Sequence, residues 1–232
     1  MTLTEIKKQT VNHYAGWWTI IGVDPLAFRI VWLLQRIAPN INPSLITTAS
    51  LIIGIAAAFS LATGEYLIGG ILYELSFLLD CIDGKMARLQ KKSSPFGAFY
   101  DGFVNSIVYC TSLVGLGASQ MDNSLMLAAV AGALFIHVIG QEMAHYQLKY
   151  GGASSARKAS NAISILARLK ENKPLMWPDR HLLVFLVFPV MGLPIVGLLA
   201  NLAVDSCLQL ARFVWITRNR NIAKPKNQEE AS

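Results

Sequence analysis

The chain has 232 residues, of which 53% are hydrophobic and only 15% are charged, and its formal net charge is +6. This composition excludes an ordinary soluble domain, in which about a quarter of the residues are charged, and indicates an integral membrane protein. The three cysteines are odd in number and lie inside apolar segments, so they predict packing residues and not a disulfide framework.

The first 38 residues are predicted to form interfacial helices. The chain start lacks the apolar core and small-residue cleavage site of a signal peptide, so no cleavage is expected. Residues 2–18 mix lysines with tyrosine and tryptophan, a combination typical of the lipid headgroup region. Residues 24–37 begin with an Asp-Pro helix start and place Arg29 and Arg36 on one face, which favours a helix lying along the membrane surface.

Six membrane-spanning helices are predicted next, each needing about 20 apolar residues to cross a hydrocarbon core of about 30 Å. They cover 43–63, 66–89, 96–119, 123–148, about 179–191 and 193–217. The fifth is too short as drawn, so either it continues from the amphipathic stretch 153–172 or the break at Pro189 and Pro194 lies within the bilayer. The predicted fold is therefore all-α, a polytopic membrane protein with a transmembrane domain over residues 39–218.

The distribution of basic residues predicts the orientation of these spans. Lys and Arg are absent from three of the predicted connections, which are 63–66, 119–123 and 191–193. By the positive-inside rule, both termini and the loops 90–95 and 149–178 are expected on the cytoplasmic side of a cell membrane. The net positive charge is thus explained by topology, and no nucleic-acid partner is expected. The tail, residues 219–232, is predicted to be disordered.

One polar stretch, DCIDGKMARLQKKSSPFGAFYDGFVN, begins at Asp80 and ends at Asn105 between two apolar segments. Asp80 and Asp83 are three residues apart, so both face one side of the second span near its cytoplasmic end. Gly84 and Ala87 follow on the same side and have almost no side chain. Two carboxylates are therefore expected beside open space.

The third span continues this pattern from the other side of the short basic loop. Gly97, Asp101 and Asn105 recur at intervals of four, which places a small residue, a carboxylate and an amide in one stripe of a helix. Clustered carboxylates in apolar surroundings repel each other unless cations neutralise them, and oxygen ligands from two helices suit Mg²⁺ or Mn²⁺. Two such ions can hold a diphosphate during phosphoryl transfer. The small residues leave room for a nucleotide, and Arg88 offers donors for phosphate.

Taken one at a time, these residues have simpler explanations. Asp83 and Gly84 alone could form a turn, and a single aspartate in a membrane could be a hydrogen-bonded packing residue or part of an ion pathway. The whole set, at helical spacing on one side of the membrane, favours a shared site.

The stretch resembles the signature of the CDP-alcohol phosphotransferases, D-x2-D-G-x2-A-R-x8-G-x3-D-x3-D. The matching residues are Asp80, Asp83, Gly84, Ala87, Arg88, Gly97 and Asp101, with every spacing intact. Only the last position departs from the signature, because it is Asn105. Pro43 and Thr47 at the start of the first span are also similar to the proline-x-x-x-threonine of that family.

The resemblance implies a membrane transferase of phospholipid or related head-group synthesis, often a homodimer. Such an enzyme moves a substituted phosphate from a CDP-linked donor, CDP-diacylglycerol or a CDP-alcohol, to an alcohol or phosphorylated alcohol and releases CMP. The implied ligands of two Mg²⁺ or Mn²⁺ ions are Asp80, Asp83, Asp101 and the last signature position. The implied nucleotide pocket consists of Asp80, Gly84, Ala87, Arg88 and Gly97. The last signature acid is also the general base of the family, so the implied catalytic residues are Asp101 and Asn105.

Asn105 leaves three hypotheses open. An amide oxygen can bind a metal, but it cannot accept a proton at neutral pH. The residue could be an engineered substitution in an active enzyme, a natural variant that uses another base, or the mark of a relative that binds nucleotide without catalysis. Glu74 and Glu142 are the nearest other carboxylates in kind, and Glu74 lies about two turns from Asp80 toward mid-membrane, which makes it an unsuitable base.

Other polar residues have less specific interpretations. His137, Glu142 and His145 predict a polar face near the cytoplasmic surface or a contact with the acceptor. Asp205, near the middle of the sixth span, is expected to pair with another group or line a cavity. Arg157 and Lys158 are candidates for binding an acceptor phosphate, with solvated charge or attraction to anionic lipid as the alternative. A transporter that uses the intramembrane acids is a further alternative function.

Overall fold

The structure of the protein is a computed structural model that describes residues 1–11, 15–150, 164–172 and 176–218. These residues form helices joined by short connections, and no strand occurs among them. The α-helices are α1 (Leu3–Thr10), α2 (Asp24–Ile37), α3 (Pro43–Ala62), α4 (Tyr66–Leu89), α5 (Pro95–Ala118), α6 (Ser124–Tyr150), α7 (Ile165–Glu171), α8 (Trp177–Leu182), α9 (Phe188–Val190) and α10 (Pro194–Arg218). Two π-helical segments are η1 (Thr19–Val23) and η3 (Leu183–Val187). Arg157, Lys158 and the tail from residue 219 lie outside the described residues.

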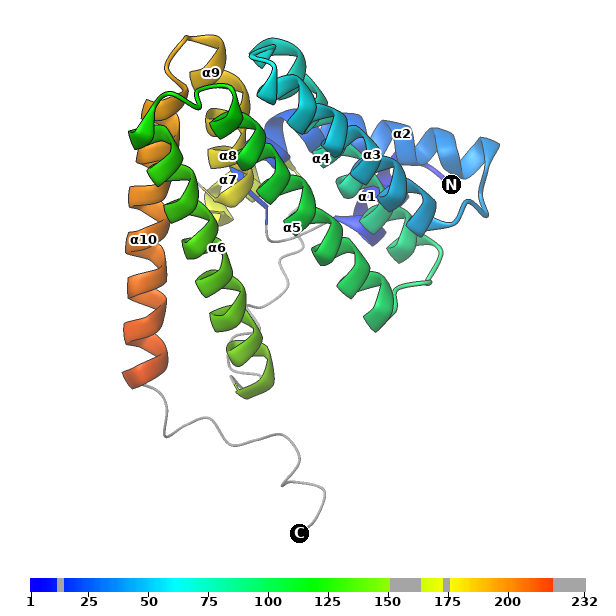
Figure 1. Ribbon diagram of the computed structural model, residues 1–232. Coiled ribbons are helices and arrows are strands. Elements are labelled where there is room, and N and C mark those ends of the chain that lie inside the picture. Colours follow the sequence, from blue (N-terminus) through cyan, green and yellow to red (C-terminus); the bar gives the residue numbers. More distant parts are fainter. Residues whose placement is uncertain (12–14, 151–163, 173–175, 219–232) are drawn as a thin grey trace.

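Three of these helices are long and apolar enough to cross a membrane, namely α3, α10 and the part of α6 from Ser124 to Gln147. The helices α4 and α5 have 24 residues each and carry the polar signature. The chain is thus an all-helical membrane protein, while six spans remain a prediction. The connections α3–α4, α5–α6 and α9–α10, which carry no Lys or Arg, lie together at the upper end of the molecule in Figure 1.

The fifth predicted span is a helix that runs from Trp177 to Val190 through α8, η3 and α9. It does not continue from α7, because Asn172 after α7 and Met176 before α8 both have extended backbone. The helix also continues through Pro189 and ends at Val190, three residues before Leu193. The prediction that this span continues from the preceding amphipathic stretch is therefore wrong. The predicted break near Pro189 and Pro194 is observed between α9 and α10, and its place within the bilayer stays a prediction.

The N-terminal segment does not begin a new helix at Asp24. The chain is already helical at Trp18, and the amide of Asp24 bonds to the carbonyl of Thr19 five residues earlier. This wider π-helical turn precedes Pro25, which lacks an amide hydrogen and cannot make a regular helical bond. The predicted bounds of α2 are otherwise those observed, with Arg29 exposed on the face opposite the buried Val31. Whether α1 and α2 lie at a membrane interface remains a prediction.

The long helices of the described molecule pack in two groups. In the first, α3 packs along both α4 and α5, and in the second, α6 packs along α10 (Figure 1). Gly115 of α5 permits the first contact, because a Cβ there would collide with the carbonyl of Ala58 in α3. The α4–α5 connection belongs to the first group and brings the two halves of the polar signature together.

Candidate metal and nucleotide site

The turn between α4 and α5 is built from specific end signals. After α4, the amide of Lys91 bonds to the carbonyl of Arg88 and the amide of Lys92 bonds to that of Ala87, which is a Schellman motif. Lys91 takes the left-handed conformation, with φ of 55°, that glycine usually provides there. Ser94 then caps α5 by accepting from the amide of Gly97 at 3.0 Å. The chain thus reverses within a few residues.

Three carboxylates converge as a result of this reversal. Asp80, Asp83 and Asp101 each offer one oxygen, and these oxygens all lie within 4.8 Å of one another. We call these three residues the acid cluster. Asp83 is buried, whereas Asp80 and Asp101 are half-buried. The sequence prediction that both helices present their acids to one point is therefore confirmed as geometry.

Neighbouring side chains hold the acid cluster by hydrogen bonds. The hydroxyl of Thr47 in α3 donates to Asp83 Oδ2 at 2.6 Å. The amide nitrogen of Asn105 donates to Asp80 Oδ1 at 2.7 Å and to Asp101 Oδ1 at 3.1 Å. Asn105 thus bridges α4 and α5. These donors are neutral and bring no positive charge to the three carboxyl groups.

The residues present fit a hard divalent cation. Three converging carboxylates in a partly buried site repel each other, and oxygen ligands of this kind are the ones that Mg²⁺ and Mn²⁺ prefer. An amide offers one oxygen ligand as well, but its donor nitrogen points to the acids in this arrangement. The acid cluster can therefore take up a divalent cation.

The small signature residues lie next to open space. A Cβ added at Gly84 would meet only the guanidinium of Arg88, at 3.5 Å, and one added at Gly97 would meet only the hydroxyl of Ser94, at 3.2 Å. Neither glycine is thus required by crowding from backbone of the described chain. Arg88 is exposed, and its guanidinium donates to the carbonyl of Thr10 at 3.1 and 3.3 Å. A donor fork and two side-chain-free positions therefore lie beside the acid cluster.

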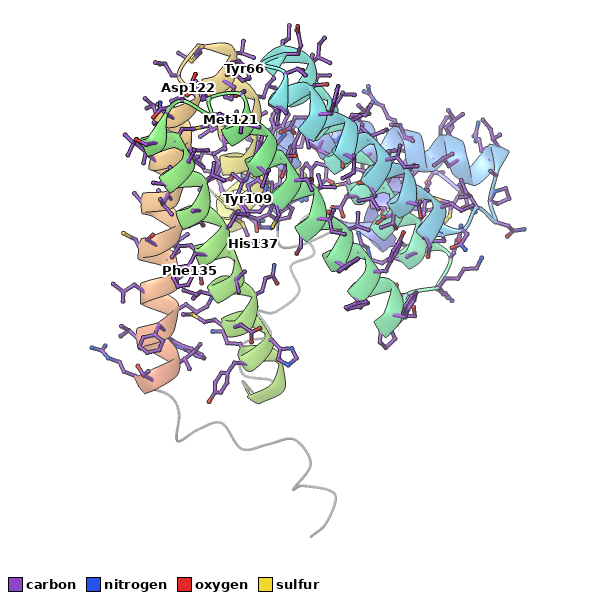
Figure 2. The ribbon with its side chains drawn as sticks, viewed as in Figure 1. Tyr66, Tyr109, Met121, Asp122, Phe135 and His137 are labelled. Carbon is purple, nitrogen blue, oxygen red and sulfur yellow. The ribbon has the colours of Figure 1, made fainter. Side chains whose placement is uncertain are left out.

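A cavity of about 750 Å³ opens on the other side of Asn105. It lies among α4, α5, α6, α8 and α10, and its lining includes Asn105, Tyr109, His137, Arg180, His181 and Asp205. Tyr109 is one turn after Asn105 on α5, and its ring lies between those of His137 and His181, with centroid distances of 4.8 and 4.6 Å. Figure 2 shows Tyr109 and His137 close together between α5 and α6.

The charged groups of this cavity are largely paired. Arg180 forms an ion pair with Asp205 and donates to Asn201 Oδ1 at 3.0 Å, while Asn201 donates to Asp205 Oδ2 at 3.0 Å. The expectation that Asp205 pairs or lines a cavity is confirmed in both respects. Arg212 donates to the carbonyl of Gly140 at 3.3 Å. The cavity is thus a preformed polar chamber next to the acid cluster.

Several of these residues were not found from the sequence. Tyr109 extends the interval of four that links Gly97, Asp101 and Asn105, so the stripe itself was a usable signal. Arg180 has no such signal, because its place opposite Asp205 depends on the packing of α8 against α10. Glu74 accepts from the indole of Trp18 at 2.7 Å, which commits its carboxylate to the N-terminal segment.

Comparison with known proteins identifies the family. The family model of CDP-alcohol phosphatidyltransferases matches residues 40–171, which include α3, α4, α5 and the acid cluster. The chain belongs to this family. The match covers more than half of the chain, and it gives no support to a transporter. Membership in the CDP-alcohol phosphatidyltransferase family explains the acidic signature but does not by itself fix the substrates.

Curated relatives share part of their length with the chain. An archaetidylinositol phosphate synthase of Aeropyrum pernix is 29% identical over 150 residues, which are 62% of this chain and 73% of the relative. A bifunctional IPC transferase and DIPP synthase of Thermococcus kodakarensis is 26% identical over 135 residues, which are 58% of this chain and only 30% of the relative. A cholinephosphotransferase 1 of Gallus gallus is 34% identical over 98 residues, which are 38% of this chain and 29% of the relative.

Solved structures share the fold. Phosphatidylinositol phosphate synthase of Mycobacterium tuberculosis with CDP-DAG bound has a TM-score of 0.60 at 18% identity, covering 82% of this chain and 92% of that chain. The same enzyme in complex with manganese and citrate has a TM-score of 0.61 at 18% identity, covering 81% of this chain and 87% of that chain. At this identity the likeness shows a common membrane-protein fold and leaves the ligands of this chain open.

Proposed function

We propose that the chain is a membrane CDP-alcohol phosphotransferase, which moves a substituted phosphate from a CDP-linked donor to an alcohol and releases CMP. The observation that carries the proposal is the acid cluster, in which Asp80, Asp83 and Asp101 converge within 4.8 Å from two helices of the family-matched region. A negatively charged diphosphate can bind beside three carboxylates only if cations lie between them.

In this proposal Asp80, Asp83, Asp101 and Asn105 hold two divalent cations, Mg²⁺ or Mn²⁺, which supply charge neutralisation for the diphosphate when bound. The chain's other signature residues form the nucleotide pocket. Gly84 and Gly97 leave the space that a nucleotide needs, and Arg88 offers its guanidinium to phosphate. Thr47 and Asn105 orient the acid cluster through their hydrogen bonds.

The donor in this proposal is CDP-diacylglycerol. Phe99 and Phe103 of α5 line the cavity, and their side chains are 64% and 52% exposed. Apolar side chains so exposed on a helix of a membrane protein can contact acyl chains directly. Phe99 and Phe103 lie on the same helix as Asp101, so a donor whose diphosphate binds at the acid cluster would have these apolar side chains next to its acyl chains. A soluble CDP-alcohol has no acyl chains to contact them.

The acceptor is proposed to enter the cavity with the alcohol toward Asn105. The charged residues that line the cavity are Arg180, Arg212 and Asp205, so the formal net charge of the lining is +1. A net positive chamber favours an acceptor with an anionic group, such as a phosphorylated alcohol. Arg157 and Lys158, which lie outside the described residues, stay additional candidates for that phosphate.

The amide of Asn105 predicts slow turnover by this chain. The residue lies between the acid cluster and the cavity, where the acceptor hydroxyl must lose its proton, and an amide cannot take it. A well-placed general base contributes about 10²- to 10⁴-fold in rate. We therefore expect Asn105→Asp to raise CMP release from CDP-diacylglycerol by at least about 100-fold, with little change in Mn²⁺-dependent affinity for CDP.

The test measures CMP release by the purified protein in detergent, with and without Mn²⁺, for the chain and for Asn105→Asp. The acceptors are glycerol phosphate, inositol phosphate and their unphosphorylated alcohols. An equally active parent chain would show that another base is used. A second candidate function, a nucleotide-binding relative without catalysis, is favoured by Asn105 alone, and CDP binding without turnover in both proteins would select it.

A further inference from the structure

A buried ion cluster lies beside the signature helix and has no part in the proposed chemistry. Asp24 of α2 pairs with Lys85 of α4 through Oδ1 and with Arg168 of α7 through Oδ2, each at 2.6 Å. The three side chains are only 2% to 4% exposed. Charges this deeply buried are held in place by one another, because separating any pair leaves a charge without compensation.

The ion cluster contacts α4 next to the residues of the acid cluster. Lys85 is two residues after Asp83 and directly after Gly84. One turn later, Arg88 donates to the carbonyl of Thr10 at the end of α1. Both cations within α4 are therefore bound by the first 37 residues, which precede the region matched by the family.

The same N-terminal segment is held from its other side by Asn172 and Asp179. The carbonyl of Asn172 accepts from the indole of Trp17 at 3.1 Å, and Asp179 Oδ1 accepts from the amide of Trp18 at 2.6 Å. Gly16 lies so close to Asp179 that a Cβ would come within 2.7 Å of its carboxylate. The segment from Gly16 to Asp24 therefore contacts α4 on one side and α7, Asn172 and α8 on the other.

We propose that Asp24 is a positioning residue for the acid cluster, an inference that rests on the proposed function. Through Lys85 it fixes the last three turns of α4, and therefore the positions of Asp80 and Asp83 relative to Asp101 on α5. Asp24 itself touches neither metal nor nucleotide. Its role is to give the metal site one geometry before any ligand arrives.

Buried charges can fix a geometry without adding stability. Apolar residues of similar volume often replace a buried ion cluster with no loss of stability, so stability alone does not require these charges. The cluster does oppose sliding or rotation of α4 against α2, because such a motion would break the 2.6 Å contact between Lys85 and Asp24, while Arg168 holds Asp24 from α7. Metal and nucleotide sites lose affinity steeply when their ligands shift, and loss of a supporting partner typically weakens metal binding about 10- to 100-fold.

The test separates positioning from stability by removing all three charges together. Asp24→Leu combined with Lys85→Met and Arg168→Met leaves no uncompensated charge, so the thermal midpoint in detergent should stay near that of the parent chain. The affinity for CDP in the presence of MnCl₂, measured by calorimetry, should fall about tenfold or more. Arg29→Gln, on the exposed face of α2, changes the charge by one unit and serves as the matched control, with parent affinity expected.

Each outcome has a distinct meaning. A triple variant that binds CDP as tightly as the parent overturns the positioning role. If the triple variant does not fold, Asp24→Glu decides, because it keeps all charges but displaces the carboxylate. A fewfold loss of CDP affinity is expected for it, and unchanged affinity would overturn the proposal. A parent chain that binds no CDP with Mn²⁺ would instead refute the proposed function.

Discussion

The acid cluster and the cavity lie on either side of Asn105, and they handle charge in opposite ways. Asp80, Asp83 and Asp101 are held by a hydroxyl and an amide, which are neutral donors. In the cavity, by contrast, Arg180 and Asp205 neutralise each other, with Asn201 bonded to both. Under the proposed function the first region takes its positive charge from cations in solution, whereas Arg180 and Asp205 supply both charges of their pair from the chain itself.

This difference explains what each region can bind. Three uncompensated carboxylates attract divalent ions and, through them, a diphosphate. The cavity, in which Arg180 and Asp205 already form an ion pair, does not depend on added ions and can select a solute by its shape and by the small net positive charge of the lining. The two proposed substrates would thus be recognised by separate physical means on the two sides of one residue.

The largest expected effect comes from removing one acid. Asp101→Asn should weaken Mn²⁺-dependent CDP binding by more than about 100-fold, since even supporting partners of a metal site typically contribute 10- to 100-fold. Because the substitution also relieves repulsion, the metal-free thermal midpoint should not fall, while its rise on addition of MnCl₂ should largely disappear. Thermal unfolding with and without MnCl₂ measures both.

A matched control for this change is available at the far end of the molecule. Asp122 lies exposed in the α5–α6 connection, which Figure 2 shows well away from Tyr109 and His137. Asp122→Asn should leave the midpoint shift caused by MnCl₂ as it is in the parent chain. An Asp101→Asn protein that still responds to MnCl₂ like this control would contradict the contrast between the two regions.

The second effect tests the self-paired region. Arg180→Met leaves Asp205 with only Asn201 and should destabilise the protein by about 2 kcal/mol, somewhat less than for a fully buried pair because the two side chains are 10% and 18% exposed. Adding Asp205→Leu should recover most of that loss. The thermal midpoints of the single and double variants give the measurement, and a double variant less stable than the single one would refute internal pairing.

Local sequence rules predicted the acid cluster well because its members lie on two neighbouring helices joined by a short turn. Intervals of three and four determine which side of a helix a residue faces, and the connection fixes the two helices against each other. The same rules could not find the partners of Asp24, because Lys85 and Arg168 lie 61 and 144 positions later in the sequence and meet Asp24 only in the folded chain. They did place the break after the fifth helix, but they could not predict the π-helical turn that precedes Pro189, a residue that usually ends a helix.

Thr47 is an intermediate case. Its position resembles the family pattern in the sequence, but its contact with Asp83 is visible only in the structure. Its hydroxyl donates to Asp83 at 2.6 Å from a third helix, so Thr47 supports the acid cluster without carrying charge. Thr47→Val keeps the shape and removes the donor, which frees the carboxylate to turn. We expect Mn²⁺-dependent CDP affinity to fall about tenfold, at the lower end for a supporting residue.

Thr48→Val is the control for this last change, because the hydroxyl of Thr48 bonds to Tyr100 and not to the acid cluster. Parent-like CDP affinity is expected for it in the same calorimetric titration. If both valine variants weakened binding equally, the loss would reflect a general disturbance of α3. If only Thr47→Val does so, a single neutral hydrogen bond sets the orientation of Asp83, and the acid cluster depends on uncharged neighbours for shape while it depends on cations for charge.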